Sequence, residues 1–305
     1  MRKRFAALLV VILLISVLSG CGGQGGATAT VKKDPKLIGL VLSSMNNPFF
    51  ISVRNGAEEK ARALGYELII LDSQNKSEKD AANVEVLIGR GVSLILLNPT
   101  DSEGATQVVE KANKAGVKVI TLDRRSNGGD VISHIASDNV EGGRTAADFL
   151  NEKLGGKGNI AMLQGIDGTS AAIDRGKGFS DRIKEFPGMQ IVVAKPAGFD
   201  RAQGLAVMEE ILREQTDLAA VFAQNDEMAL GALPAISASG KNILVVGFDG
   251  VADALTAIDE GRMAATVQQQ PELMGTLGVE AADRVLKGMV VDAFIPVELK
   301  LVVGE

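Results

Sequence analysis

The chain alternates short apolar runs with segments of helical period, and the same order occurs twice. In the first half the apolar runs lie at 36–43, 67–71, 93–97 and 117–122. About 125 residues further on, four more runs follow at 159–163, 190–194, 219–223 and 243–248. Strands that alternate with helices in this way form parallel sheets covered by helices. The pattern therefore predicts an α/β fold with two similar parallel sheets.

The ends of the matching runs also agree. In both halves the third run is followed by an asparagine, Asn98 or Asn225, and the fourth by an aspartate, Asp123 or Asp249. Strand-like runs can match by chance, but shared polar endings favour a duplicated domain.

Capping residues predict where the helices of the first half begin and end. Asn47 and Pro48 are typical of a helix start, and Gly65 of a helix end. Further helices are expected at about 77–90 and 102–115.

The first residues have the three parts of a secretory signal. Arg2, Lys3 and Arg4 precede an apolar stretch at 5–18, which is shorter than a membrane-spanning helix needs. The stretch ends in Leu-Ser-Gly-Cys, which resembles a bacterial lipobox. We therefore expect a lipoprotein signal peptide at 1–20, lipidation of Cys21, and a Gly- and Ala-rich flexible tether at 21–33. The alternative is an ordinary signal peptide that contains a cysteine by chance.

Charge and composition argue against several classes of site. The formal net charge is −6, so bulk charge does not favour a surface for nucleic acid or anionic lipid. With one Cys and one His, an intramolecular disulfide and a Cys/His metal cluster are excluded. We expect neither a metal nor a cofactor. His134 lies in a strand-like run and is interpreted as structural.

Polar and aromatic side chains follow the predicted strands. Ligands of open parallel sheets bind beyond the carboxyl ends of the strands, so these side chains are candidates for one site. They are amides, carboxylates, guanidinium groups and phenyl rings, and they lie at 43–50, 123–125, 164, 175, 199–201, 224–227, 249 and 268–270. Carboxylates accept hydrogen bonds from hydroxyls, guanidinium groups donate to them, and amides do both. The set suits a small neutral polyol whose C–H faces pack against phenyl rings.

Each of these residues also has a structural alternative. Phe49 and Phe50 are compatible with a helix core, and the two aspartates with strand ends or helix caps. Arg175 is compatible with a solvated helix face. Asp123 and Arg124 are adjacent, so both face one ligand only if the strand ends before them.

Several longer motifs carry a family resemblance. They are NNPFF (46–50), LDSQN (71–75), NPTDS (98–102), TLDR (121–124), SHIASDNV (133–140), LQGIDGTSAA (163–172), AQNDEMALGAL (223–233) and VVGFDG (245–250). From about residue 36 to Val303 the chain resembles the ribose-binding members of the type I periplasmic solute-binding proteins of ABC importers. The resemblance implies two doubly wound lobes joined by a three-segment hinge. Lobe one would be 34–137 plus 270–298, and lobe two 138–269 plus 299–305.

The resemblance also implies a function. Carried over position by position, the sugar-facing residues would be Asn47, Phe49, Phe50, Asp123, Arg124, Arg175, Phe199, Asn225, Asp249 and Gln269. Each of these ten positions holds the residue of the family, and no catalytic residue is implied. The expected protein is a monomeric, non-enzymatic binder on the outer face of the cytoplasmic membrane. It would capture D-ribose between closing lobes and deliver it to an ABC permease with its ATPase. A related pentose, hexose or furanose, or a role as a sensor that feeds a chemoreceptor, is the alternative.

Overall fold

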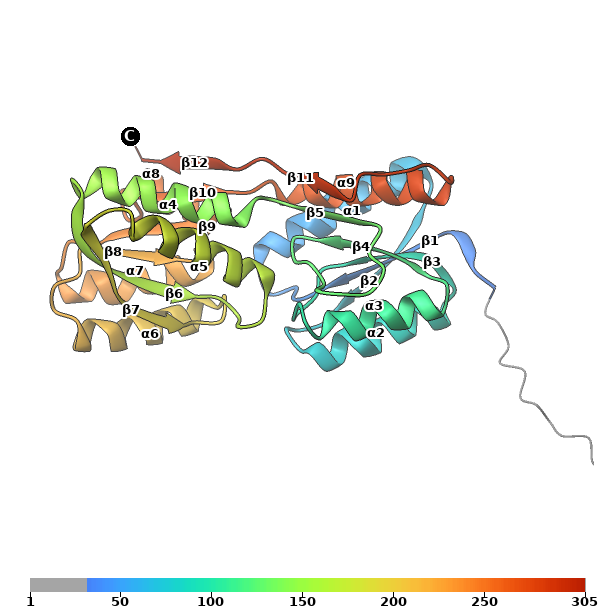
Figure 1. Cartoon of the computed structure of the whole chain (residues 1–305), viewed down its shortest axis with the longest axis horizontal. Helices are drawn as coiled ribbons and strands as arrows, with labels where there is room; N and C mark the ends of the chain where they lie inside the picture. The colour runs from blue at the N-terminus through green and yellow to red at the C-terminus, as the bar shows by residue number, and fades with distance from the viewer. Residues whose placement is uncertain (1–31, 305) are drawn as a thin grey trace, which may run out of the picture. The chain divides into compact units, whose positions relative to one another are not determined.

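The computed structural model describes residues 32–304, which form an α/β fold (Figure 1). The predicted signal peptide, Cys21 and most of the tether lie outside these residues. The strands are β1 (Asp34–Leu42), β2 (Glu67–Asp72), β3 (Val92–Leu97), β4 (Lys118–Leu122), β5 (Ser133–Ala136), β6 (Lys157–Gln164), β7 (Gly188–Pro196), β8 (Ala220–Ala223), β9 (Leu244–Asp249), β10 (Ala265–Gln268), β11 (Phe294–Pro296) and β12 (Lys300–Val303). The helices are α1 (Pro48–Leu64), α2 (Ser77–Gly89), α3 (Ala105–Lys114), α4 (Asn139–Lys153), α5 (Ser170–Ile183), α6 (Arg201–Glu214), α7 (Asp226–Ser239), α8 (Ala252–Asp259) and α9 (Pro271–Leu286).

The strands form two six-stranded sheets with the same order. One sheet runs β11-β5-β4-β3-β1-β2 and the other β12-β10-β9-β8-β6-β7. The repeat predicted from the sequence is therefore a repeat of topology. One pairing breaks it, because β11 is parallel to β5 whereas β12 is antiparallel to β10. The inner strands are buried on both faces, which explains why their sequences are apolar throughout.

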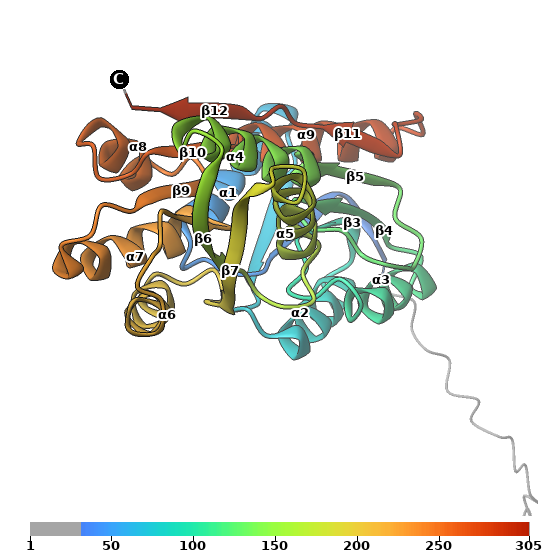
Figure 2. The same ribbon diagram turned by 60° about the vertical axis from the view of Figure 1, so that its left-hand side comes forward.

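The chain passes from one sheet to the other three times. It does so between β5 and α4, between β10 and α9, and between β11 and β12 (Figures 1 and 2). As a result α9 packs on α1 and on strands of the first sheet, while α4 packs on α5 and on strands of the second. We refer to the two halves as lobe one, which contains the β1 sheet, and lobe two, which contains the β6 sheet.

Helix boundaries follow local signals where tertiary contacts do not intervene. Asn47 caps α1 through its side chain, and Gly65 ends that helix in the left-handed conformation, as predicted. The helix expected from Ser102 instead begins at Ala105. The reason is tertiary: the Ser102 amide donates to the Gly168 carbonyl, and its hydroxyl accepts from the Ser170 amide.

Close packing of α4 on α5 fixes the position of Arg175, the second arginine of the predicted site. A Cβ on Gly143 would lie 2.3 Å from the Arg175 carbonyl oxygen, and one on Gly178 would lie 2.0 Å from the Val140 carbonyl oxygen. The backbones of α4 and α5 are therefore in contact beside Arg175. No helix among residues 32–304 is long and apolar enough to cross a membrane.

Candidate functional site

A small cavity lies at the carboxyl ends of the strands, lined from both lobes. Nine of the ten residues singled out from the sequence line it, together with Ala171. They are Asn47, Phe49, Phe50, Asp123, Arg124, Arg175, Phe199, Asn225 and Asp249. Gln269 lies behind them, where its Nε2 donates to Asp249 Oδ1 at 2.9 Å.

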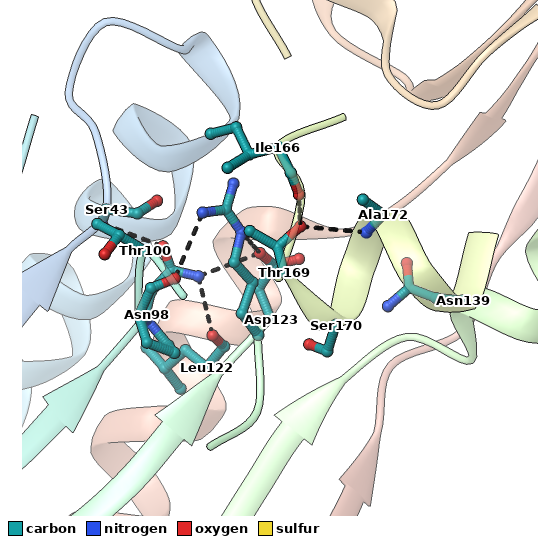
Figure 3. Close-up of polar contacts among 12 residues, drawn as sticks. Ser43, Asn98, Thr100, Leu122, Asp123, Asn139, Ile166, Thr169, Ser170 and Ala172 are labelled. Atoms are coloured by element: carbon teal, nitrogen blue, oxygen red, sulfur yellow. Dashed lines mark hydrogen bonds and ion pairs between the residues drawn. The ribbon is translucent and has the colours of Figure 1, made fainter. Parts of the chain in front are cut away.

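The turn after β4 presents Asp123 and Arg124 to the cavity. Asp123 has a φ of 58°, which is rare for a residue with a side chain. This turn is the reason that two adjacent residues line one cavity, since β4 ends at Leu122. Asn98 holds the turn: its Nδ2 donates to the Leu122 carbonyl at 3.0 Å and to Asp123 Oδ2 at 3.1 Å, and its Oδ1 accepts from the Ser43 amide (Figure 3).

Lobe two presents Asp249 in a comparable way. Asp249 ends β9 with a φ of 114°, and Arg175 Nη1 lies 3.2 Å from its Oδ1. Arg175 is fixed in turn by Asn139, whose Oδ1 accepts from Nε at 2.8 Å, and by the Gln224 carbonyl at 2.7 Å. The buried Asp226 accepts from the amides of Gly250 and Val251 at 2.6 and 2.9 Å, which anchors the turn that follows Asp249.

The two cavity asparagines are also helix caps. Asn47 Oδ1 accepts from the Phe49 amide at the start of α1, and Asn225 Oδ1 accepts from the Met228 amide at the start of α7. A cap holds the side-chain amide in one orientation. Each of these two asparagines can therefore cap a helix and line the cavity at the same time.

Three phenyl rings complete the lining. Phe49 and Phe50 meet edge to face with centroids 5.2 Å apart. The Arg124 guanidinium lies 5.3 Å from the Phe50 centroid and 5.4 Å from that of Phe199. A Cβ on Gly165 would lie 2.1 Å from the Phe199 ring, so glycine is needed for that ring to reach the cavity.

The charges in the cavity are buried and balanced. Burial raises the pKa of Asp123, and the Arg124 and Arg175 guanidinium groups oppose that rise. Burial likewise raises the pKa of Asp249, to about 6, against the opposing effect of Arg175. Burial lowers the pKa of Arg124, and Asp123 counteracts it. Two carboxylates matched by two guanidinium groups favour a neutral ligand over a charged one.

Several buried polar atoms at the site have no hydrogen-bond partner within residues 32–304. They are Asp123 Oδ1, Arg124 Nε and Gln269 Oε1. Buried polar atoms are normally paired, so a ligand with hydroxyl groups would satisfy the two that belong to cavity-lining residues. No group of three or more His, Cys, Asp or Glu side chains in this part of the chain is arranged to hold a metal ion.

Sequence reasoning missed the supporting residues. The sequence does not show that Asn98, Asn139 and Gln224 hold the charged residues of the site. The matching asparagine after the third run of each half was the available signal. It marked the right strand ends, but only the fold shows that Asn98 supports Asp123 whereas Asn225 lines the cavity itself.

Comparison with known proteins identifies the family of the chain. The family model described as periplasmic binding protein domain matches residues 38–289. The ribose import binding protein RbsB of Haemophilus influenzae is 47% identical over 302 residues, 99% of each chain. The protein of the same name from Bacillus subtilis is 50% identical over 264 residues, 87% of this chain and 86% of that one.

Solved structures give the same fold. An ABC transporter solute-binding protein from Bacillus halodurans with bound myo-inositol matches with a TM-score of 0.83 and 35% identity, covering 88% of this chain and 95% of that one. The binding component of the arabinose ABC transporter from Shewanella, bound to L-arabinofuranose, matches with a TM-score of 0.82 and 34% identity, covering 87% and 91%. With two lobes of one topology, three crossings and a polar cavity between them, this chain belongs to the periplasmic binding protein family.

Proposed function

We propose that the chain is the extracytoplasmic binding protein of a sugar ABC importer and that its ligand is D-ribose. The observation that carries the proposal is the cavity itself. Two carboxylate–guanidinium pairs and two asparagine amides from both lobes surround it, beside three phenyl rings. Relatives that are 47% and 50% identical are named ribose import binding proteins, which favours ribose among the sugars that such a cavity suits.

The proposed mechanism is closure of two lobes on the sugar. Lobe one, 34–137 plus 270–298, supplies Asn47, Phe49, Phe50, Asp123 and Arg124; lobe two, 138–269 plus 299–305, supplies Arg175, Phe199, Asn225, Asp249 and Gln269. The sugar contacts both groups together only when the lobes are closed. Its binding therefore shifts the open–closed equilibrium toward the closed form. The closed form then delivers the sugar to the permease.

Selectivity follows from the buried polar groups. Each carboxylate oxygen or guanidinium N–H that pairs with a sugar hydroxyl is left unpaired when the ligand lacks that hydroxyl. Sites of this kind reject such analogues by up to ~10⁴–10⁵-fold. The same groups argue for binding rather than turnover, because both aspartates are paired with arginines. We therefore propose that the protein is not an enzyme.

The remaining proposals concern its place and assembly. We propose a lipid anchor on Cys21, which would hold a monomeric binder at the outer face of the cytoplasmic membrane. Mass spectrometry of the chain from membranes would detect the acyl groups on Cys21.

One observation favours a second ligand class. Solved relatives at 34–35% identity hold myo-inositol or L-arabinofuranose, so the same fold takes a cyclic polyol or a furanose. A related pentose, hexose or furanose is therefore the alternative ligand.

Calorimetric titration tests the proposal. The purified chain is unfolded and refolded to remove bound sugar, then titrated with ribose, arabinose, allose and myo-inositol. Tight one-to-one binding of ribose alone is the expected result, with the sugar recovered unchanged after long incubation. Tight binding of another sugar would keep the mechanism and replace the ligand, and no binding of any sugar would overturn the proposed function.

A further inference from the structure

Two arginines follow Asp123, and only the first lines the cavity. The second, Arg125, reaches α5 of lobe two, where its guanidinium pairs with the Asp174 carboxylate through both oxygens; the longer contact, Nη2 to Oδ1, is 3.2 Å. Such a two-point pair fixes orientation as well as distance. Arg125 does not line the binding cavity.

The chain neighbours of this pair are cavity residues on both sides. Arg125 follows Arg124 in lobe one, and Asp174 precedes Arg175 in lobe two. On each lobe, therefore, adjacent residues face the cavity and the opposite lobe. The movement that brings Arg124 and Arg175 to one ligand is the movement that brings Arg125 to Asp174.

Buried hydrogen bonds continue from the ion pair. The Arg125 amide donates to Ser170 Oγ at 3.0 Å, and the Ser170 amide donates to Ser102 Oγ at 3.0 Å; Ser170 lies beside the Asp123 turn (Figure 3). The Ser102 amide donates to the Gly168 carbonyl at 3.1 Å. Ser102 and Ser170 are 1% and 2% exposed. We call Ser102, Arg125, Gly168, Ser170 and Asp174 the clasp.

The clasp accounts for the polar contacts between the lobes. Among the hydrogen bonds and ion pairs of residues 32–304, those that join the lobes away from the three crossing segments all belong to it. A second, larger cavity of about 120 Å³ adjoins the site, lined from lobe one by Ser44, Asn46 and Asn75 among others, and from lobe two by Asp200, Arg201 and Glu227. There Arg201 pairs with Glu227 and Asp253 of its own lobe. At this second cavity no hydrogen bond or ion pair among residues 32–304 joins the lobes.

We propose that the clasp sets ligand affinity without touching the ligand, by stabilising the closed form and slowing release of the sugar. The inference rests on the proposed function. It follows from linkage, because the apparent dissociation constant of a ligand held by one conformation falls as that conformation becomes more populated. Arg125 and Asp174 are the adjustable part, since their side chains are 41% and 19% exposed and salt screens them.

Charge reversal tests the proposal. Ribose affinity and the rate of release of labelled ribose are measured for Arg125→Asp, for Asp174→Arg, and for the two together. Each single change should raise Kd at least tenfold, mainly by faster release, and the double change should return Kd to within about threefold of the starting chain. Lys60→Glu, which disrupts an ion pair with Glu280 inside lobe one, is the matched control and should leave both values unchanged.

A second measurement does not depend on ribose. In a chain with Cys21→Ser, the pair Ser102→Cys and Ser170→Cys should cross-link on oxidation whenever the lobes close. Arg125→Asp should slow the cross-link several-fold, and adding Asp174→Arg should restore it. Equal cross-linking in all three chains, single reversals with unchanged Kd, or a double reversal as weak as the singles would overturn the proposal. The two cysteines replace the same clasp hydroxyls in all three chains, so differences in cross-linking rate report on the Arg125–Asp174 pair. If the starting chain binds no ribose, the proposed function fails, and the cross-linking rates still decide whether this ion pair holds the lobes together.

Discussion

The two lobes share one strand order, yet they support their cavity aspartates differently. Asp123 relies on Asn98, a side chain of its own lobe that also ties two strand ends together. Asp249 relies on Arg175 and Gln269, and the turn beyond it on the buried Asp226. A duplicated topology thus gives two equivalent backbone positions, whereas the groups that hold each carboxylate differ between the lobes.

The largest expected effect is loss of either carboxylate. Asp123→Ala and Asp249→Ala should each weaken ribose binding at least ~10³-fold, because sugar hydroxyls and a buried arginine lose their partner. Calorimetry measures the loss, and circular dichroism checks that the fold persists. Asp181→Ala on the exposed face of α5 is the control and should bind normally. Near-normal affinity in either variant would show that the lobe concerned does not hold the sugar through its aspartate.

Acid should lower the stability of the protein through His134, which lies in lobe one. Burial lowers the pKa of His134 to about 4, and its Nδ1 lies 2.9 Å from Thr121 Oγ1. The unfolded chain binds this proton below about 6.5, so stability should fall as the pH drops from 6.5 to 4, by up to ~3 kcal/mol. Urea unfolding across this range measures the slope. His134→Gln should flatten it, and an unchanged slope would assign the effect to other groups.

Rising pH should lower the stability of the protein through Asp226, which lies in lobe two. Burial and the nearby Asp249 raise the pKa of Asp226 to about 8. The native state therefore holds a proton that the unfolded state has released, and stability should fall as the pH rises, until about 8. Between pH 6.5 and 8, where His134 no longer contributes, the expected loss is ~2 kcal/mol. Asp226→Asn should remove this slope in urea unfolding; a slope that persists would contradict the assignment.

The smallest effects should come from the supporting amides, and they should differ between lobes. Asn98→Ala leaves the Ser43 amide and Asp123 Oδ2 without their partner, so we expect a loss of about 1–3 kcal/mol in unfolding free energy and a weaker Kd. Gln269→Ala removes one bond to Asp249, which Arg175 still holds, and should cost less. Equal losses in both variants, by urea unfolding and calorimetry, would mean that the lobes support their aspartates alike.

Local sequence signals predicted most of the framework. Apolar runs located the inner strands, and Asn47, Pro48 and Gly65 located α1, because burial on both faces and helix capping act over a few residues. The nine cavity residues were found from the sequence because strand ends of parallel sheets collect at one edge and because their motifs resemble a known family.

Local sequence signals could not predict the contacts between residues far apart in the chain. The start of α3 at Ala105 rather than Ser102 depends on Gly168 and Ser170, far along the chain. The same holds for Asn98 and for Arg125, whose partners lie in other strands or in the other lobe. The identity of a polar residue does not show which distant group its side chain will contact.

The sequence by itself determined the two-sheet α/β architecture and the chemical character of the cavity, because periodicity, caps and strand-end residues are local properties. Tertiary structure alone decided which side chain supports each aspartate and which distant carboxylate pairs with Arg125. Those outcomes depend on contacts between residues that are far apart in the chain. At Asp123, for example, a φ of 58° turns the chain so that Arg124 lines the cavity while Arg125 reaches Asp174 on α5.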